Sequence, residues 1–141
     1  MSPVLDTHTV LWYLENSKEL SAFARTTIED AIRDGRHVHV SAISVIEAVY
    51  LVERKKIPAA ALQRLRSALT DPSVGLFIAP VDGFVADALE KIPRSIVPDM
   101  PDRIIAATAL HHGLTVVYRD VSDYRRAHAS VLNPWTDSPA A

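Results

Sequence analysis

The 141-residue sequence contains no cysteine and only four glycines, at positions 35, 75, 83 and 113. Without cysteine, disulfides, thiolate metal ligands and a cysteine nucleophile are excluded. The glycines form neither a GxGxxG nor a GxxxxGK[ST] loop, and no GxSxG serine motif occurs. Nucleotide-cofactor and serine-hydrolase functions therefore have no support in this sequence.

Long apolar runs are also missing. The best candidate for a membrane span, residues 43–52, is interrupted by Glu47 and is far shorter than the roughly 18 residues required. The first basic residue is Lys18, so the N-terminus lacks the basic region of a signal peptide. We expect a cytoplasmic protein with one domain over residues 1–135 and a flexible tail at 136–141.

The net charge of −2 does not indicate nucleic-acid binding by itself. Basic residues nevertheless gather locally at Arg54-Lys55-Lys56, at Arg64 and Arg66, and at Arg125-Arg126. Such groups are typical of solvated helix faces. Beside a metal-loaded acidic site they would instead suit contacts to an RNA backbone.

Short apolar segments alternate with segments of helical periodicity along the chain. Strands are expected at 4–5, 38–40, 76–78 and 115–118, with an edge strand at 130–132. Helices are expected at 7–15, 21–34, 44–56, 58–69, 82–90 and 102–112, the third starting with a capping box formed by Ser44 and Glu47. This alternation predicts an α/β fold with parallel strands and right-handed crossovers.

Four acidic residues follow predicted strands or begin predicted helices: Asp6, Glu47, Asp102 and Asp120. In a parallel sheet these positions lie at the edge where the strands end, which is where ligands bind in open α/β folds. Four converging carboxylates would repel one another unless cations compensate, and oxygen ligands suit Mg²⁺ or Mn²⁺. The pattern predicts a metal-dependent enzyme acting on phosphate.

Each acid also has a structural alternative. Asp6 could be a helix N-cap, Asp102 a first-turn acid, and Asp120 a turn residue, while Glu47 could serve only the capping box. Their shared position at one sheet edge favours a site. Two further acids are weaker candidates: a turn role is expected for Asp99, and Asp123 is left open between a turn and the site.

Six histidines are present. His37 and His39 share a strand face without a zinc-ligand partner at suitable spacing, so we interpret them as solvent-facing. His111 and His112 end a helix before Gly113, where a cation complements the helix dipole. His8 either lines the crevice beside Asp6 or is an ordinary turn residue.

The sequence resembles a known family in four segments that occur in the family's order. VLDTHTVLW at 4–12, SAISVIE at 41–47, PDMPDRIIAATA at 98–109 and VYRDVSDY at 117–124 resemble the four motifs of PIN-domain ribonucleases, particularly toxins of VapC type. The resemblance extends over residues 4–135. One position departs from it, because Tyr118 stands where the fourth motif, T-x-[DN]-x-x-D-[FY], carries Thr or Ser.

The resemblance implies a three-layer α/β/α sandwich around a mostly parallel sheet of four to five strands. It implies a Mg²⁺- or Mn²⁺-dependent endoribonuclease that cleaves cellular RNA such as tRNA or rRNA, forms a homodimer and is neutralised by a small antitoxin. Asp6, Asp102 and Asp120 would hold the metal, with Asp123 as a weaker ligand. Glu47 would complete the metal shell or orient the attacking water.

The expected dimer has a candidate surface on the early helices. Apolar side chains there exceed the needs of one core stripe, although a broad core contact would explain them equally well: Trp12, Tyr13, Tyr50, Leu51 and Val52.

Two other functions compete with the nuclease. A PIN-fold binding module without catalysis would follow if Tyr118 crowds the metal site. A phosphoryl-accepting receiver domain would need an Asp after a middle strand and a late Lys, but only Asp82 follows such a strand and the last Lys is Lys91.

Overall fold

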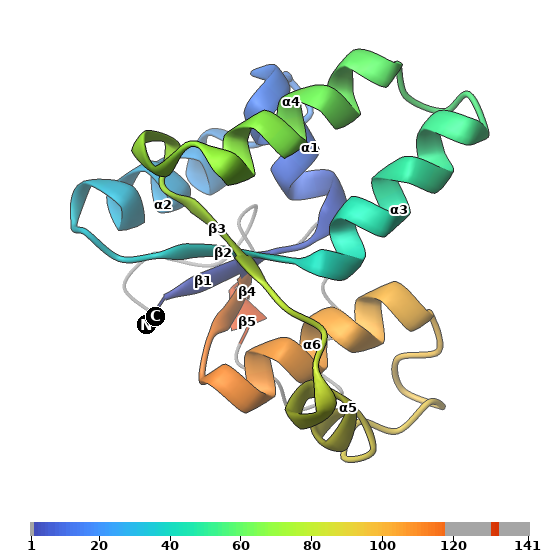
Figure 1. Cartoon of the computed structure of the whole chain (residues 1–141). Helices are drawn as coiled ribbons and strands as arrows, with labels where there is room; N and C mark the ends of the chain where they lie inside the picture. Colours follow the sequence, from blue (N-terminus) through green and yellow to red (C-terminus); the bar gives the residue numbers. More distant parts are fainter. Residues whose placement is uncertain (1, 118–130, 133–141) are drawn as a thin grey trace.

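The computed structural model describes residues 2–117 and the strand at 131–132 (Figure 1). The strands are β1 (Pro3–Leu5), β2 (Val38–Ser41), β3 (Leu76–Ala79), β4 (Thr115–Val117) and β5 (Val131–Leu132). The helices are α1 (Thr7–Glu15), α2 (Ala22–Arg33), α3 (Ala42–Glu53), α4 (Ala59–Thr70), α5 (Gly83–Leu89) and α6 (Met100–His112), and a 3₁₀ turn spans Pro72–Val74. The predicted tail at 136–141 lies outside the described residues.

The five described strands form one parallel sheet in the order β3-β2-β1-β4-β5. Helices α1 to α4 lie on one side of the sheet, and α5 and α6 lie on the other (Figure 1). Strand β1 is central, because Val4 is paired with His39 of β2 on one side and with Val116 of β4 on the other. The predicted three-layer α/β/α architecture is confirmed.

Alternating side chains of the central strands enter two separate cores. Val4 and Val116 belong to the cluster formed with α5 and α6, whereas Leu5 and Val117 belong to the cluster formed with α1 to α4. Successive residues of a strand point to opposite faces, so two adjacent apolar residues serve both layers. Because both faces are covered, the central strands read as continuous apolar runs, as is typical of parallel sheets.

Two predicted helix starts and one predicted helix end are wrong. Helix α3 ends at Glu53 and not at residue 56, because Lys55 has a left-handed backbone with a φ of 59°. Helix α3 begins at Ala42 and not at Ser44, because the Ser41 hydroxyl accepts a hydrogen bond from the Ile43 amide at 3.2 Å and caps the helix directly after β2. Helix α6 begins at Met100 and not at Asp102, with Pro101 inside its first turn. A proline fits there because first-turn amides have no partner within the helix.

Two predicted helix boundaries are confirmed, the start of α5 and the end of α6. Asp82 caps α5 by accepting from the Val85 amide at 3.0 Å, and α6 ends at Gly113, whose φ of 66° is left-handed. Among the residues that the structure describes, no helix is long and apolar enough to cross a membrane.

Candidate active site at the carboxyl edge of the sheet

Three of the predicted site residues lie at the edge where the parallel strands end. Asp6 directly follows β1, and Glu47 lies in α3, which starts directly after β2. Asp102 is in the first turn of α6; the last turn of this helix leads through Gly113 into the start of β4. Because α6 therefore runs antiparallel to the strands, its first turn lies at their carboxyl ends. We call Asp6, Glu47 and Asp102 at this edge the acidic edge.

Asp6 is fixed on both sides by the backbone. Its amide donates to the Val117 carbonyl at 3.0 Å, which joins the end of β1 to the end of β4. Its Oδ1 accepts from the Thr9 amide at 2.9 Å, and only 7% of the residue is exposed. The N-cap role considered for Asp6 is confirmed, and the cap also sets the orientation of this buried carboxylate.

Glu47 is held by side chains rather than by a capping box. The Thr7 hydroxyl lies 2.5 Å from Glu47 Oε1 and 2.9 Å from the Ser44 hydroxyl. A hydroxyl has one proton and an ionised carboxylate can only accept, so Thr7 donates to Glu47 and accepts from Ser44. Thr7 and Ser44 are buried, so this chain links α1 to α3 away from water.

Asp102 is positioned by its neighbours in the sequence. Its amide donates to Asp99 Oδ2 at 3.1 Å, so Asp99 is the N-cap of α6 and not the turn residue that was predicted. The guanidinium of Arg103 donates to the Ile92 carbonyl at 2.8 Å and to the Leu89 carbonyl at 3.2 Å. These bonds tie the start of α6 to the segment after α5 and so fix where Asp102 stands.

The donor chemistry of the acidic edge suits a hard divalent cation. Mg²⁺ binds carboxylate oxygens, usually one or two, and completes its shell with water and substrate phosphates. Within residues 2–117 no three His, Asp or Glu side chains are grouped closely enough to hold a metal ion between them. Asp120, Asp123 and Tyr118 lie outside the described residues. The carboxylates at this edge fit Mg²⁺ or Mn²⁺ in type, but Asp6, Glu47 and Asp102 by themselves are not grouped closely enough to hold the ion.

Thr7 and Ser44 were missed as site residues. Both belong to the segments that carry the resemblance, but the sequence assigns Ser44 to a capping box and gives no sign that Thr7 bonds to Glu47. Only the packing of α1 against α3 reveals their contact, since 37 positions separate them along the chain.

His37 and His39 form ring contacts away from the carboxyl ends of the strands, whereas His8 lies two residues after Asp6. His37 stacks on Phe77 with ring centroids 4.0 Å apart, and His39 lies 6.2 Å from His37. The prediction that both histidines face solvent holds for His37 but is wrong for His39, which is half-buried because this face of β2 is turned toward α6. Burial, followed by the nearby His37 and His112, lowers the pKa of His39 below its ordinary value. His8 contacts the ring of Trp12 at 5.8 Å.

Comparison with known proteins identifies the family. The model of the PIN domain matches residues 4–128. The chain belongs to the PIN domain family. Ribonuclease VapC22 of Mycobacterium tuberculosis is 32% identical to it over 137 residues, covering 94% of this chain and 97% of that protein. The resemblance seen in the sequence is thereby confirmed at the level of the family.

Solved structures share the PIN fold of this chain over nearly their full length. A chain in the crystal structure of FitAcB from Neisseria gonorrhoeae has a TM-score of 0.68 and 28% identity, covering 95% of this chain and 99% of that one. A chain in the structure of VapBC2 from Rickettsia felis bound to a DNA fragment of its promoter has a TM-score of 0.73 at 16% identity, covering 94% and 98%. The second likeness supports the fold alone.

Proposed function

We propose that this PIN domain is the toxin of a toxin–antitoxin pair, a Mg²⁺- or Mn²⁺-dependent endoribonuclease that hydrolyses cellular RNA such as tRNA or rRNA in the cytoplasm. The observation that carries the proposal is that acids from three separate elements, Asp6, Glu47 and Asp102, share the carboxyl edge of the sheet. The full-length similarity to a protein named ribonuclease VapC22 supports the reaction class.

In the proposed site, Asp6, Asp102 and Asp120 hold the metal, and Asp123 is a weaker ligand. The metal, when bound, polarises the phosphodiester and lowers the pKa of a bound water. Glu47 would orient the attacking water: Thr7 holds its Oε1, which leaves the other carboxylate oxygen to accept a hydrogen bond from the water. Asp99 and Arg103 keep Asp102 in place through the backbone of α6.

The proposed partners are a small antitoxin and a second copy of the chain. An antitoxin would neutralise the acidic edge with an Arg or Lys, whose cation takes over the role of the metal charge. For the dimer, the early helices offer less surface than expected, because Tyr13 and Leu51 pack against the core and only Tyr50 of the predicted set is largely exposed. Ile46 and Tyr50 are exposed on α3, but a longer run of exposed apolar side chains follows β3 into α5, and we assign self-association to this run: Ile78, Val81 and Phe84.

Substitution of neighbouring acids tests the metal site. Asp102→Asn keeps the shape but removes a ligand charge, so cleavage of cellular RNA in Mg²⁺ or Mn²⁺ should fall by about two orders of magnitude or more. The matched control is Asp99→Asn, three residues earlier, which removes the same charge but keeps a side-chain oxygen that caps α6. It should leave both stability and cleavage largely intact. EDTA should abolish cleavage by the wild type.

Two outcomes would contradict the nuclease. Equal cleavage by wild type and Asp102→Asn would identify a contaminating activity. No cleavage by the wild type in either metal would favour the binding module without catalysis, and Tyr118→Thr would then test whether the tyrosine blocks the site.

A further inference from the structure

The turn between α3 and α4 carries three successive cations, Arg54, Lys55 and Lys56, and all three are exposed. Within the described residues none of them forms a salt bridge, and the one acid beside them is Glu53. From Ala48 to Leu69 the sequence holds five basic residues against that single acid, in a chain whose net charge is −2. The α3–α4 hairpin is therefore a local cationic surface on an acidic protein.

Lys55 occupies a backbone conformation that disfavours lysine. Its φ is 59°, and the amides of Lys55 and Lys56 bond back to the carbonyls of Val52 and Leu51, which is the Schellman ending of a helix. This position prefers glycine, and the chain does place glycine, Gly113, at the left-handed end of α6. A left-handed L-residue costs roughly 1–2 kcal/mol, so a local rule is broken here, as is common where a side chain has a function.

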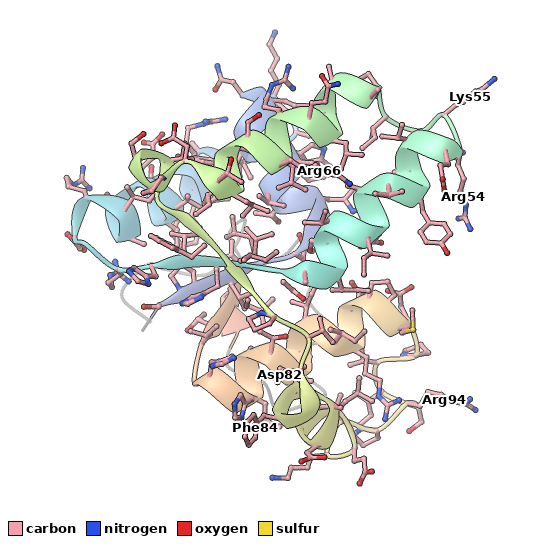
Figure 2. All side chains as sticks on the ribbon, in the orientation of Figure 1. Arg54, Lys55, Arg66, Asp82, Phe84 and Arg94 are labelled. Carbon is pink, nitrogen blue, oxygen red and sulfur yellow. The ribbon has the colours of Figure 1, made fainter. Side chains whose placement is uncertain are left out.

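The same helix connects the cations to the acidic edge. Glu47, Tyr50 and Arg54 follow one stripe of α3 at spacings of three and four residues, so their side chains lie on one face. A rise of 1.5 Å per residue separates Glu47 from Arg54 by about 10 Å along the axis. Figure 2 shows Arg54 and Lys55 at the outer end of α3.

Tyr50 stands between the acid and the cations and is not used by the core. Tyr50 is 55% exposed, and the guanidinium carbon of Arg54 lies 5.9 Å from the centre of the tyrosine ring. Exposed rings beside a cationic groove are how proteins bind single-stranded nucleic acid without sequence preference, by stacking on bases and contacting phosphates.

We propose that the outer part of α3 is a binding track for single-stranded RNA: Tyr50 stacks on a base, and Arg54 and Lys55 contact phosphates of the strand whose scissile bond lies at the acidic edge. This inference rests on the proposed ribonuclease function and extends it to the part of the substrate beside the cleaved bond. Charge complementarity selects the occupant, because the exposed cations of the track attract the phosphates of a nucleic-acid strand.

The test measures binding of a fluorescein-labelled single-stranded RNA of mixed sequence in EDTA, which prevents cleavage, at several salt concentrations. For Arg54→Gln/Lys55→Gln the slope of log affinity against log salt should be smaller by about 1.4, because each lost phosphate contact on a single strand removes about 0.7. Its affinity at low salt should fall by on the order of tenfold. The charge-keeping variant Arg54→Lys/Lys55→Arg should behave like the wild type.

The matched control removes the same number of charges elsewhere. Lys18 and Arg33 are exposed and lie outside the hairpin, on the α1–α2 connection and in the last turn of α2. Lys18→Gln/Arg33→Gln should leave the slope unchanged. Tyr50→Ala should weaken binding about tenfold and Tyr50→Phe should not, since stacking needs only the ring.

Equal slopes for the two double variants, or no binding of the RNA by the wild type at low salt, would overturn the track. Its failure is separable from failure of the nuclease. If the wild type cleaves RNA in a metal-dependent way but the Arg54→Gln/Lys55→Gln variant binds RNA with the wild-type slope, the track is wrong and the nuclease stands. Binding that follows the predicted slopes without cleavage in any metal would do the reverse.

Discussion

At the scale of single residues, the hydroxyl of Thr7 joins two helices through one oxygen. Replacing it with Thr7→Val keeps the branched shape but leaves the Ser44 hydroxyl and the Glu47 carboxylate without this partner. Leaving buried polar groups unpaired costs about 1–3 kcal/mol, and a carboxylate that loses its orienting bond aligns water less well. We expect Thr7→Val to unfold at a lower urea concentration and to cleave RNA more slowly. Thr7→Ser keeps the hydroxyl and should retain most of the stability and most of the cleavage rate.

A Thr7→Val protein that cleaves RNA at the wild-type rate would show that Glu47 needs no such support. Dividing kcat by the folded fraction measured in the same buffer strengthens the test, because a loss of folded protein lowers only the apparent kcat, whereas a loss of orientation lowers the kcat of the folded enzyme.

His39 predicts how stability depends on pH. Its pKa is lowered by burial and by the nearby His37 and His112. Below the ordinary pKa of about 6.5, His39 is therefore protonated in the unfolded chain but still neutral in the folded protein. The free energy of unfolding should therefore decrease as the pH falls from 8 through 6.5, until the folded pKa is reached. Urea unfolding at several pH values measures this, and His39→Gln should flatten the decrease. An unchanged pH dependence in that variant would contradict the assignment.

The places of Asp6, Glu47 and Asp102 at the carboxyl edge could be predicted because each follows a strand or begins a helix that local patterns reveal, while their role in catalysis stays a prediction. The cap at Asp82 could be predicted for the same reason. Thr7 and Ser44 could not be assigned, since their contact depends on how α1 packs on α3. The predicted capping box is wrong: Ser44 and Glu47 have the right spacing, but Ser41, one turn earlier, already caps the helix.

At the scale of elements, two left-handed glycines end helical turns under different conditions. Gly75, before β3, has a φ of 86°, and an added Cβ would lie 3.0 Å from Ile32 Cγ1, whereas a Cβ at Gly113 would meet nothing within 4 Å. Both alanine variants pay roughly 1–2 kcal/mol for the backbone, but Gly75→Ala must also displace Ile32.

Gly75→Ala should therefore lower the urea midpoint more than Gly113→Ala. Equal midpoints would mean that α2, which carries Ile32, moves aside at no cost. The slope of the unfolding transition should be the same for both variants, because neither changes the surface exposed on unfolding.

Most helices and strands could be predicted because hydrophobic periodicity and glycine or proline boundaries agree along this chain. The strand 76–78 and the edge strand at 130–132 are confirmed within one residue as β3 and β5. The 3₁₀ turn at Pro72–Val74 was not foreseen, since three residues show no periodicity. Strand order could not be read from the residues alone, because it depends on which faces the helices cover.

At the scale of the whole molecule, exposed apolar side chains predict self-association. Sedimentation at micromolar concentration should give a species of twice 15.5 kDa. Phe84, which is 67% exposed, lies in the assigned surface, so Phe84→Glu should shift the protein toward the monomer. Met100→Glu, an equally exposed apolar residue at the acidic edge, should not. A pure monomer in the wild type would contradict the dimer.

The central position of β1 also bears on how the protein is made. Pro3 pairs with Thr115, so the first strand synthesised waits for one of the last before the sheet can close. At translation rates of about 5–20 residues per second, this wait is roughly 5 to 20 s. Asp6 cannot bond to Val117 earlier than that. A growing chain therefore cannot assemble the sheet edge that carries Asp6 until β4 has left the ribosome.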